Sequence, residues 1–410
     1  MKEKHFVILG NSAAGISAIK AIRDYDRESK ITLVSAEPVL AYSPVLTTYL
    51  IGRRIKSNEM HFIDRDFYGK YGVTPILGIK AVGIDTSQKE VRLENDSIVP
   101  YDKLLIATGS SPKKMGLEGE DLPGVFHLKT LYDAESIRDY SENAKEVLVM
   151  GGGLIGLQAA NGLHSDERKV TMLVGSKQLL SRNVDENCGR MLAEGMEKVG
   201  VTMRFGRNPK RIRQENGRLE VDLDNGEVLK TDMIVIGKGV RGNMDLVRDS
   251  DIATNQGIMV DEMARTNVED VYAAGDVTEG PCILDGKHAV LANWLNACRQ
   301  GLAAGSNMVG RQATYFNLGE NVTTVFDTSI AVIGISSAKS PEHSEAVHFD
   351  TDKRIYRKII CNEKNEVIGM VVLNDFVDVG MVSTAIQNRE VIDPNYAEKI
   401  VKGHYPFQVR

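Results

Sequence analysis

Two short stretches of this 410-residue chain have the residue types and spacing of a phosphate-binding turn. The first contains Gly10, Ser12 and Gly15, and the second contains Gly151, Gly153 and Gly156. In a G-x-G-x-x-G turn the first glycine forms the tight turn, the second lets the backbone approach a pyrophosphate, and the third packs helix on strand. The phosphates then lie on the N–H groups and the positive dipole end of the helix. Ser12 departs from this pattern, but its side chain is small and its hydroxyl could itself contact a phosphate.

An acidic residue stands where a dinucleotide-binding unit needs one. Glu37 closes the apolar stretch ITLVSAE and lies 22 positions past Gly15 (37 minus 15). An acid at this distance accepts a hydrogen bond from a ribose hydroxyl. The alternative is a solvated carboxylate at the end of a strand.

The elements around the two turns repeat. Each turn follows an apolar run typical of a central parallel strand and opens a helix, predicted over 13–25 in the first copy and from near 154 in the second. In both copies a hairpin and a further strand follow. The repeat, 141 positions apart (151 minus 10), predicts an α/β chain with two Rossmann-like dinucleotide-binding domains. The loop 111–124, with two Pro and three Gly, predicts a crossing between the domains.

The second half of the chain adds further elements. Residues 257–277 predict a strand pair, and 289–309 predict a helix that contains Trp294. The stretches RIYRKIIC and EVIGMVVL predict antiparallel strands around an NEKN turn.

Composition excludes several classes of protein. A net charge of −6 argues against a general nucleic-acid binder, and no apolar run approaches the length of a membrane span. The N-terminal stretch MKEKHFVILG lacks the apolar region of a signal peptide. The four cysteines are Cys188, Cys282, Cys298 and Cys361. Their wide spacing predicts no disulfide framework, metal site or cluster motif, and therefore a cytoplasmic protein.

Five pieces of the chain now stand in a characteristic order. They are GNSAAG with Glu37, YDKLLIATGS (101–110), GGGLIG (151–156), TDMIVIGKG (231–239) and TNVEDVYAAGDV (266–277). This order resembles the glutathione-reductase-like superfamily of FAD- and NAD(P)H-dependent flavoproteins over about residues 5–310. Within it the chain looks most like ferredoxin and rubredoxin reductases and the flavin region of nitrite reductase. It is also similar to the FAD/NADH subunits of phenylglyoxylate dehydrogenase and tungsten aldehyde oxidoreductase.

The resemblance implies three domains and two sets of binding residues. The implied domains are a discontinuous FAD domain (1–112 and 234–311), an inserted NAD(P) domain (113–233) and an α+β C-terminal interface domain (312–410). The implied FAD set is Gly10, Ser12, Ala13, Ala14, Gly15, Glu37, Ser43, Pro44, Ala81, Thr108, Gly109, Asp276, Val277 and Trp294. The implied NAD(P) set is Gly151, Gly153, Leu154, Ile155, Gly156, Ser176, Lys177 and Gly239. Asp276 would hold the ribityl chain, and the helix of Trp294 would direct N–H groups toward the flavin's pyrimidine edge.

The stretch AYSPVLTTYLIG (41–52) departs from the thiol-dependent relatives. Those relatives carry a redox cysteine in this region, whereas here there is neither Cys nor Lys. A hydroxyl cannot store two electrons, so thiol chemistry is disfavoured. Thr48 stands where ferredoxin-reductase-type relatives often have a Lys facing the flavin, and Gln158 replaces the acid usual after the second turn. Both are flavin-side candidates; the alternative is that they only pack.

The resemblance implies an FAD-dependent NAD(P)H:acceptor oxidoreductase. With no sulfur relay, electrons would leave for an iron–sulfur or metal-containing partner subunit. Two basic clusters could dock it: Arg53, Arg54 and Lys56, and then Arg204, Arg207, Lys210, Arg211 and Arg213. The C-terminal domain could form an oligomer, and His343, His348 and His404 there predict surface positions. The alternatives are a free-standing NADH oxidase or peroxidase, and a non-catalytic FAD-binding redox scaffold.

The sequence gives a weak indication of the nucleotide. Val174 stands where NAD-specific relatives have an acid, so the usual ribose acceptor is missing. Ser176 and Lys177 could touch a 2′-phosphate, but there is no arginine pair to clamp it. The resemblance to the multi-component subunits favours NAD(H), with NADP(H) left open.

Overall fold

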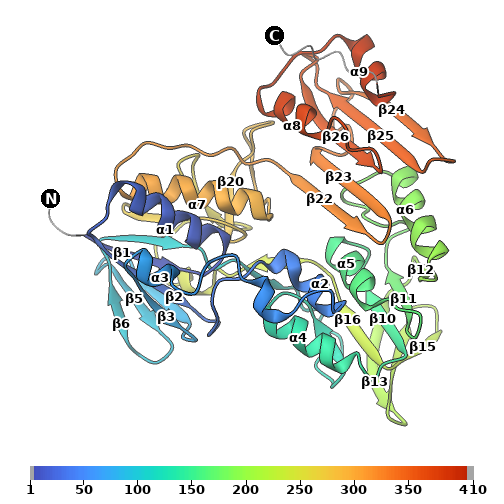
Figure 1. The fold of residues 1–410 in the computed structure, drawn as a ribbon, viewed down its shortest axis with the longest axis horizontal. Helices are drawn as coiled ribbons and strands as arrows, with labels where there is room; N and C mark the ends of the chain where they lie inside the picture. Colours follow the sequence, from blue (N-terminus) through green and yellow to red (C-terminus); the bar gives the residue numbers. More distant parts are fainter. Residues whose placement is uncertain (1–3, 404–410) are drawn as a thin grey trace. The chain divides into compact units, whose positions relative to one another are not determined.

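The computed structural model describes residues 4–403, and the chain forms two compact units (Figure 1). Unit 1 comprises Met1–Val45, Asn58–Ser111 and Val240–Leu318. Unit 2 comprises Leu46–Ser57, Pro112–Gly239 and Gly319–Arg410. Each unit contains a five-stranded sheet whose strands are all parallel, so the α/β class with two Rossmann-like units is confirmed.

The central sheet of unit 1 has the strand order β19-β7-β1-β2-β3. Its strands are β1 (His5–Leu9), β2 (Lys30–Ser35), β3 (Val73–Leu77), β7 (Lys103–Ile106) and β19 (Val271–Ala273). The helices of the unit are α1 (Ala13–Tyr25), α3 (Phe67–Lys70) and α7 (Trp294–Met308). The sequence predicts α1 with these same bounds, because its small and branched apolar residues recur at helical spacing.

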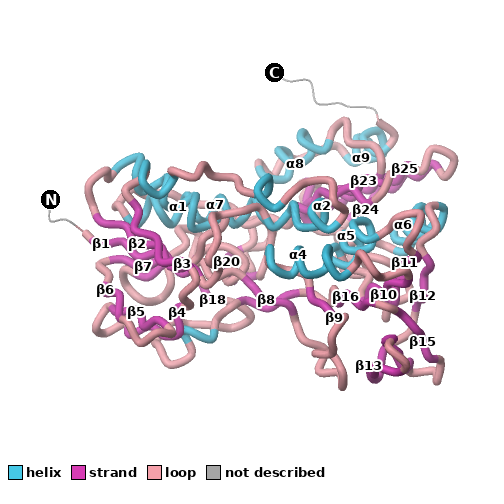
Figure 2. Tube along the Cα trace, turned by 60° about the horizontal axis from the view of Figure 1, so that its bottom comes forward, coloured by secondary structure: helices cyan, strands magenta, loops and turns pink. Residues whose placement is uncertain are grey.

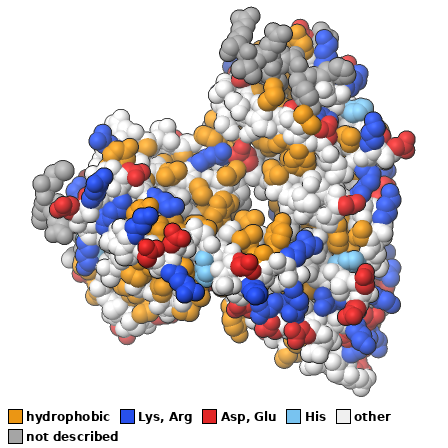
Figure 3. Space-filling view, viewed as in Figure 1, with side chains coloured by type: hydrophobic (Ala, Val, Ile, Leu, Met, Phe, Trp, Pro, Cys, Tyr) orange, Lys and Arg blue, Asp and Glu red, His pale blue; other side chains and the backbone are white. Residues whose placement is uncertain are grey.

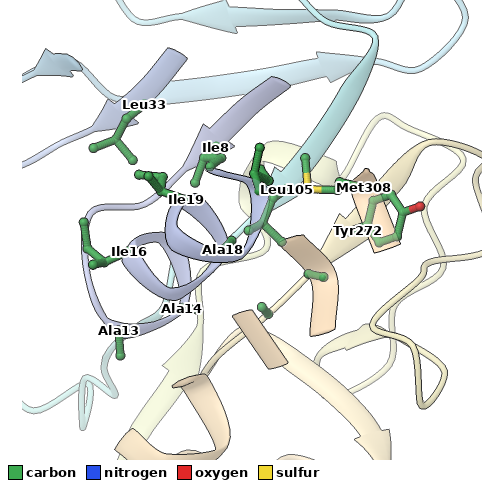
Figure 4. Close-up of a cluster of buried hydrophobic side chains, with 14 of the residues drawn as sticks. Ile8, Ala13, Ala14, Ile16, Ala18, Ile19, Leu33, Leu105, Tyr272 and Met308 are labelled. Atoms are coloured by element: carbon green, nitrogen blue, oxygen red, sulfur yellow. The ribbon is translucent and has the colours of Figure 1, made fainter. Parts of the chain in front are cut away.

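One face of this sheet is covered by α1 and α7. Ile8, Leu33 and Leu105 project from the strands toward Ile16 and Ile19 of α1 in a fully buried cluster (Figure 4). The two helices lie side by side in the ribbon of Figure 1 and in the tube of Figure 2. They can approach this closely because Gly301 and Gly305 of α7 have no side chain. A Cβ at either position would overlap the backbone of α1. Close packing of small residues therefore fixes the helix that follows the first glycine turn.

The other face of the sheet packs against a small antiparallel sheet. Its strands are β4 (Ala81–Asp85), β5 (Glu90–Leu93) and β6 (Ile98–Pro100), one more strand than the predicted hairpin. A third sheet contains β18 (Ile258–Met259), β20 (Thr278–Pro281) and β21 (His288–Ala289). The predicted strand pair within 257–277 is wrong, because β18 pairs with β20 while β19 joins the central sheet beside β7. Short 3-10 helices lie at Pro44–Leu46, Ser57–Met60 and Asp245–Val247.

The parallel sheet of unit 2 has the order β12-β11-β10-β16-β9. Its strands are β9 (Val125–His127), β10 (Glu146–Met150), β11 (Lys169–Val174), β12 (Thr202–Phe205) and β16 (Met233–Ile236). The accompanying helices are α2 (Thr47–Ile51), α4 (Leu131–Tyr140), α5 (Leu154–Leu163) and α6 (Glu186–Lys198). An antiparallel sheet of β13 (Pro209–Glu215), β14 (Arg218–Leu223) and β15 (Val228–Thr231) buries an apolar cluster against it. The short strands β8 (Ser110–Pro112) and β17 (Val240–Gly242), which belong to unit 1 except for Pro112, pair with each other.

The rest of unit 2 is an antiparallel sheet of order β22-β23-β26-β25-β24. Its strands are β22 (Glu320–Val325), β23 (Thr328–Gly334), β24 (Ser344–Asp350), β25 (Ile355–Cys361) and β26 (Val367–Leu373), with helices α8 (Val379–Gln387) and α9 (Pro394–Val401). The predicted antiparallel pairing of RIYRKIIC with EVIGMVVL is confirmed as β25 and β26. His343 and His348 are half-buried, and His404 lies outside the described residues.

Candidate functional site

The first glycine turn has a backbone that only glycine tolerates at its ends. Gly10 has φ +130°, and a Cβ there would overlap the carbonyl oxygen of Ala107. A Cβ at Gly15 would overlap the carbonyl oxygen of Gly10. Ser12 is the N-cap of α1, and its hydroxyl makes no capping hydrogen bond with the helix. The N-terminal N–H groups of α1 therefore border a tight turn, as binding of a phosphate requires.

Four residues of the predicted FAD set share one edge of the unit 1 sheet. Gly10, Glu37, Thr108 and Asp276 follow β1, β2, β7 and β19 in turn. Because all these strands are parallel, their carboxyl ends lie at the same edge, where open α/β sheets bind their ligands. Glu37 is half-buried and its Oε2 accepts a 2.8 Å hydrogen bond from the Tyr42 hydroxyl. This bond orients the carboxylate rather than leaving it to solvent.

The turn after β7 is held by residues that the sequence reasoning missed. Asn243 donates its side-chain amide to Thr108 O (2.8 Å), and its own carbonyl accepts from Thr108 Oγ1 (3.0 Å). Gly109 in this turn has φ +66°, with no atom within 4 Å of a Cβ built on it. Ser110 Oγ donates to Asp276 Oδ2 at 2.7 Å, which joins this turn to the one after β19. The stretch VRGN, directly after the strand-turn TDMIVIGKG, was the available signal for Asn243.

Other members of the FAD set lie in the same unit. Trp294 is the first residue of α7, whose N-cap Asn293 accepts from Asn296 N at 2.9 Å. The helix therefore begins five residues later than predicted (294 minus 289), because β21 occupies His288–Ala289. Trp294 meets Phe62 edge-to-face, with ring centroids 5.1 Å apart.

The remaining FAD candidates lie near turns or in the core. Ala81 begins β4, Ser43 donates its N–H to Met60 O (2.9 Å), and Pro44 begins a 3-10 helix. Val277 is fully buried, which leaves only its backbone for a ligand. Ala13 and Ala14 open α1. The whole predicted FAD set thus belongs to unit 1.

The second glycine turn repeats the geometry of the first. Gly151 also has φ +130°, and a Cβ there would overlap the carbonyl oxygen of Gly237. A Cβ at Gly156 would overlap Gly151 O, whereas a Cβ at Gly153 would meet nothing within 4 Å. The middle glycine thus leaves open space at the start of α5, which Leu154 and Ile155 continue. This is a cradle of the shape that a pyrophosphate needs, and the predicted NAD(P) set belongs to unit 2.

The carboxyl edge of the unit 2 sheet carries the remaining nucleotide candidates. Ser176 and Lys177 follow β11, and Gly239 follows β16. Val174 is fully buried and presents no acceptor. Ser176 Oγ donates to Gln178 O at 2.7 Å, and Lys177 is exposed.

Thr48 and Gln158, the two flavin-side candidates, are in direct contact within unit 2. Thr48 Oγ1 donates to Gln158 Oε1 at 3.1 Å. The Gln158 amide donates in turn to Thr323 Oγ1 on β22. A Cβ at Gly162 of α5 would come within 2.8 Å of Thr48 O, so small residues let α2 and α5 pack tightly.

Acids neutralise part of the charge of each basic cluster. In the second cluster Arg211 pairs with Asp222 (2.8 Å), and Arg213 pairs with the neighbouring acids of β14. In the first, Arg53 pairs with Glu142 (2.9 Å), while Arg54 is exposed and lies over the Tyr49 ring. On the face shown in Figure 3, blue and red side chains are interspersed.

The cysteines are free and dispersed. Cys188 and Cys361 are buried and Cys282 and Cys298 are half-buried. Burial raises the pKa of the Cys298 thiol. The described residues contain no group of three or more His, Cys, Asp or Glu side chains placed to bind a metal. Within residues 4–403 no helix is both long and apolar enough to span a bilayer.

Comparisons with known proteins agree with this geometry. Residues 4–301 match the family model described as pyridine nucleotide-disulphide oxidoreductase. The chain is 30% identical to the epsilon subunit of NADH-dependent phenylglyoxylate dehydrogenase from Aromatoleum evansii, over 95% of this chain and 93% of that protein. It is 28% identical to rubredoxin-NAD(+) reductase from Pseudomonas putida, over 74% and 80%. It spans 48% of a matching nitrite reductase from Bacillus subtilis, at 28% identity over 94% of this chain. A ferredoxin reductase structure from Rhodopseudomonas palustris superposes with a TM-score of 0.90 at 21% identity, covering 98% of this chain and all (100%) of that one.

Proposed function

Because this chain belongs to the pyridine nucleotide-disulphide oxidoreductase family, we propose that it passes electrons between NAD(P)H and an iron–sulfur or other metal-containing partner protein, without a redox-active cysteine. FAD and a nicotinamide dinucleotide are the cofactors of this family, and the chain is an NAD(P)H-dependent oxidoreductase. What we propose is the identity of the partner and the transfer of electrons from the flavin to it without a cysteine in between.

In this proposal each unit holds one cofactor. The turn at Gly10, with Glu37 and Asp276, binds FAD, and the turn at Gly151 binds the nicotinamide dinucleotide. Both turns fit, since a Cβ at Gly10 or at Gly151 would overlap backbone at a positive φ, and position 153 has open space at the N-terminus of α5. FAD exchanges a hydride with nicotinamide and electrons, singly or in pairs, with an acceptor. The protein's own residues orient the two cofactors and bind their phosphates.

The observation that carries the choice of acceptor is the chemistry of residues 41–52. This stretch contains no cysteine, and Thr48 within it is bonded to Gln158. Neither side chain can accept and release two electrons, so a thiol–disulfide step has no group to perform it there. The name of the rubredoxin-NAD(+) reductase relative supports an iron–sulfur or iron-containing acceptor, and that of the epsilon subunit supports a place in a complex.

The experiment is anaerobic rapid mixing of the FAD-loaded protein with NADH or NADPH. We expect the flavin absorbance to bleach within seconds. The reduced protein is then mixed with oxidised rubredoxin, with a [2Fe–2S] ferredoxin, or with air-saturated buffer. Reoxidation by one of the metal proteins should be far faster than by oxygen.

Two results would replace the proposal with its alternatives. Fast reoxidation by oxygen, with none by either metal protein, identifies an NADH oxidase. No bleaching over several minutes by either nucleotide identifies a flavin-binding scaffold.

A further inference from the structure

Lys238 is a half-buried lysine at the end of a central strand of unit 2. It follows β16 directly after Gly237, and burial lowers the pKa of its ammonium group. Among the described residues no carboxylate lies within ion-pair distance of it. A desolvated ammonium without a partner is costly, so such a group at a binding edge is a candidate contact for an anionic ligand.

The side chain of Lys238 reaches across the carboxyl edge of the sheet. Its Nζ lies 3.7 Å from the position that a Cβ on Gly175 would occupy. Gly175 follows β11, whereas Lys238 follows β16, and β10 with its glycine turn lies between these strands. The ammonium therefore lies on the β11 side of the Gly151 turn. In dinucleotide-binding units this strand end meets the adenosine ribose.

Positions 174 and 175 supply no carboxylate at this strand end. Asn208 Oδ1 would lie 2.5 Å from a Cβ on Gly175, so position 175 has no room for a side chain of its own. Val174 gives no carboxylate to accept from ribose hydroxyls. Asp224 already accepts hydrogen bonds from Asn208 N (3.1 Å) and Nδ2 (3.2 Å).

Further donors stand at the same edge. The Ser176 hydroxyl already donates to Gln178 O, whereas Lys177 and Arg207 are exposed cations that follow β11 and β12, which pair in parallel. Three cations, Lys238, Lys177 and Arg207, thus follow the strands at this edge, where Val174 offers no carboxylate.

We infer that Lys238 binds the 2′-phosphate of NADP(H), and that this chain takes NADPH in preference to NADH. The inference rests on the nucleotide site in the proposed function and names the form of nucleotide that the site selects. The phosphate dianion and the half-buried ammonium compensate each other's desolvation in a charge-assisted hydrogen bond. An adenosine ribose without the phosphate leaves Lys238 unpaired, so NADH loses that bond.

The test uses binding of two probes to the FAD-loaded full-length protein by calorimetry. The probes are 2′,5′-ADP, which carries the 2′-phosphate, and 5′-AMP, which lacks it. We expect the wild type to bind 2′,5′-ADP about tenfold tighter or more. We expect Lys238→Met to weaken 2′,5′-ADP by about tenfold and to leave 5′-AMP within about twofold.

The control is Lys169→Met, which removes an exposed lysine from the opposite end of β11 and should change neither affinity. Melting temperature and flavin content show that each variant is folded. If Lys238→Met does not fold, the wild-type protein provides the test. A preference for 2′,5′-ADP over 5′-AMP that decreases with salt supports the inference. Equal wild-type affinities, or equal weakening of both probes by Lys238→Met, would overturn the inference.

Failure of this inference and failure of the proposed function give different results. Binding of 2′,5′-ADP needs no electron transfer. A protein that selects 2′,5′-ADP through Lys238 but whose flavin is not bleached by NADPH keeps the inference and loses the proposed function. A protein whose flavin is bleached by NADH, but which binds 2′,5′-ADP and 5′-AMP equally, keeps the proposed function and loses this inference.

Discussion

Thr48 on α2 donates a 3.1 Å hydrogen bond to Gln158 on α5, and Gln158 passes the chain of bonds on to Thr323 of β22. Three segments that are far apart in the sequence are thereby joined through neutral side chains. In the resembling reductases a cation and an acid are usual at the first two positions. The structure gives this chain a hydrogen-bonded neutral pair in place of an ion pair, and Thr48 is 6% exposed.

This relationship predicts strong coupling between charged replacements. Thr48→Lys or Gln158→Glu alone places a charge without a partner in a mostly buried contact, which should cost about 3 kcal/mol or more. The double variant restores an ion pair and should recover much of the loss. Melting temperatures of the four proteins in a double-mutant cycle measure this. Additive losses would mean that the two side chains do not interact.

Flavin retention should depend on Gly10. Gly10→Val adds a Cβ that overlaps Ala107 O at a positive φ, so the turn must deform and the flavin content should fall to a small fraction of the wild-type value. The ratio of absorbance at 450 and 280 nm in purified protein measures it. Gly69→Ala is the matched control, because a Cβ at Gly69 meets nothing within 4 Å in the same unit. Normal flavin content in Gly10→Val would contradict the assignment of this turn.

Stability should depend on pH through Asp185, the N-cap of α6. Burial raises the pKa of Asp185, but hydrogen bonds from Lys358 and Tyr356 outweigh this, and the pKa lies below its ordinary value of 3.8. A carboxyl with a depressed folded-state pKa contributes stability above its unfolded pKa, and that stability is lost as pH falls through the folded value. Asp185→Asn should therefore cost about 3 kcal/mol at pH 7, because Lys358 is 3% exposed and loses its nearer partner.

The same reasoning gives the pH window of the effect. The difference in melting temperature between wild type and Asp185→Asn should be constant between pH 5 and 8 and shrink below about pH 4. A difference that grows as the pH falls would contradict this sign. Glu345, 3.4 Å from Lys358, is the remaining partner and limits the loss.

Partner docking should depend on Arg54 of the first basic cluster, which is exposed over the Tyr49 ring. Arg54→Gln should raise the KM for an acidic iron–sulfur acceptor and leave flavin reduction by NAD(P)H unchanged, and the effect should fade at high salt. Arg211→Gln removes the same charge from the second cluster, where Asp222 already pairs with it, and should leave that KM unaltered. Equal effects of the two variants would show that only overall charge matters.

The sequence predicted the two turns because local chemistry determines them. A positive φ at Gly10 and Gly151 and the overlap that a Cβ would cause follow from the turn type itself. The signals for the strands and for α1 are also local, because they are apolar runs with strand or helix periodicity. The domain boundaries and the roles of the binding residues stay predictions.

The features that the sequence does not predict depend on contacts between segments that are far apart in the chain. Nothing local in residues 257–277 shows that β19 joins the central sheet while β18 pairs with β20. Asn243 and Lys238 were missed for the same reason, since each acts on a turn that other strands supply. The preference for NAD(H) came from resemblance alone, and the position of Lys238 argues the other way.

The C-terminal hairpin β22–β23 contacts one face of α5 at successive turns, through Gln158 to Thr323, Asn161 to the Phe326 N–H, and His164 to the Phe326 ring. The same helix begins at the second glycine turn. A chimera that takes its last ninety or so residues from a relative will therefore need the donor's residues at 158, 161 and 164 as well. Without them the graft would leave amide groups unmatched along the helix that begins at the second glycine turn.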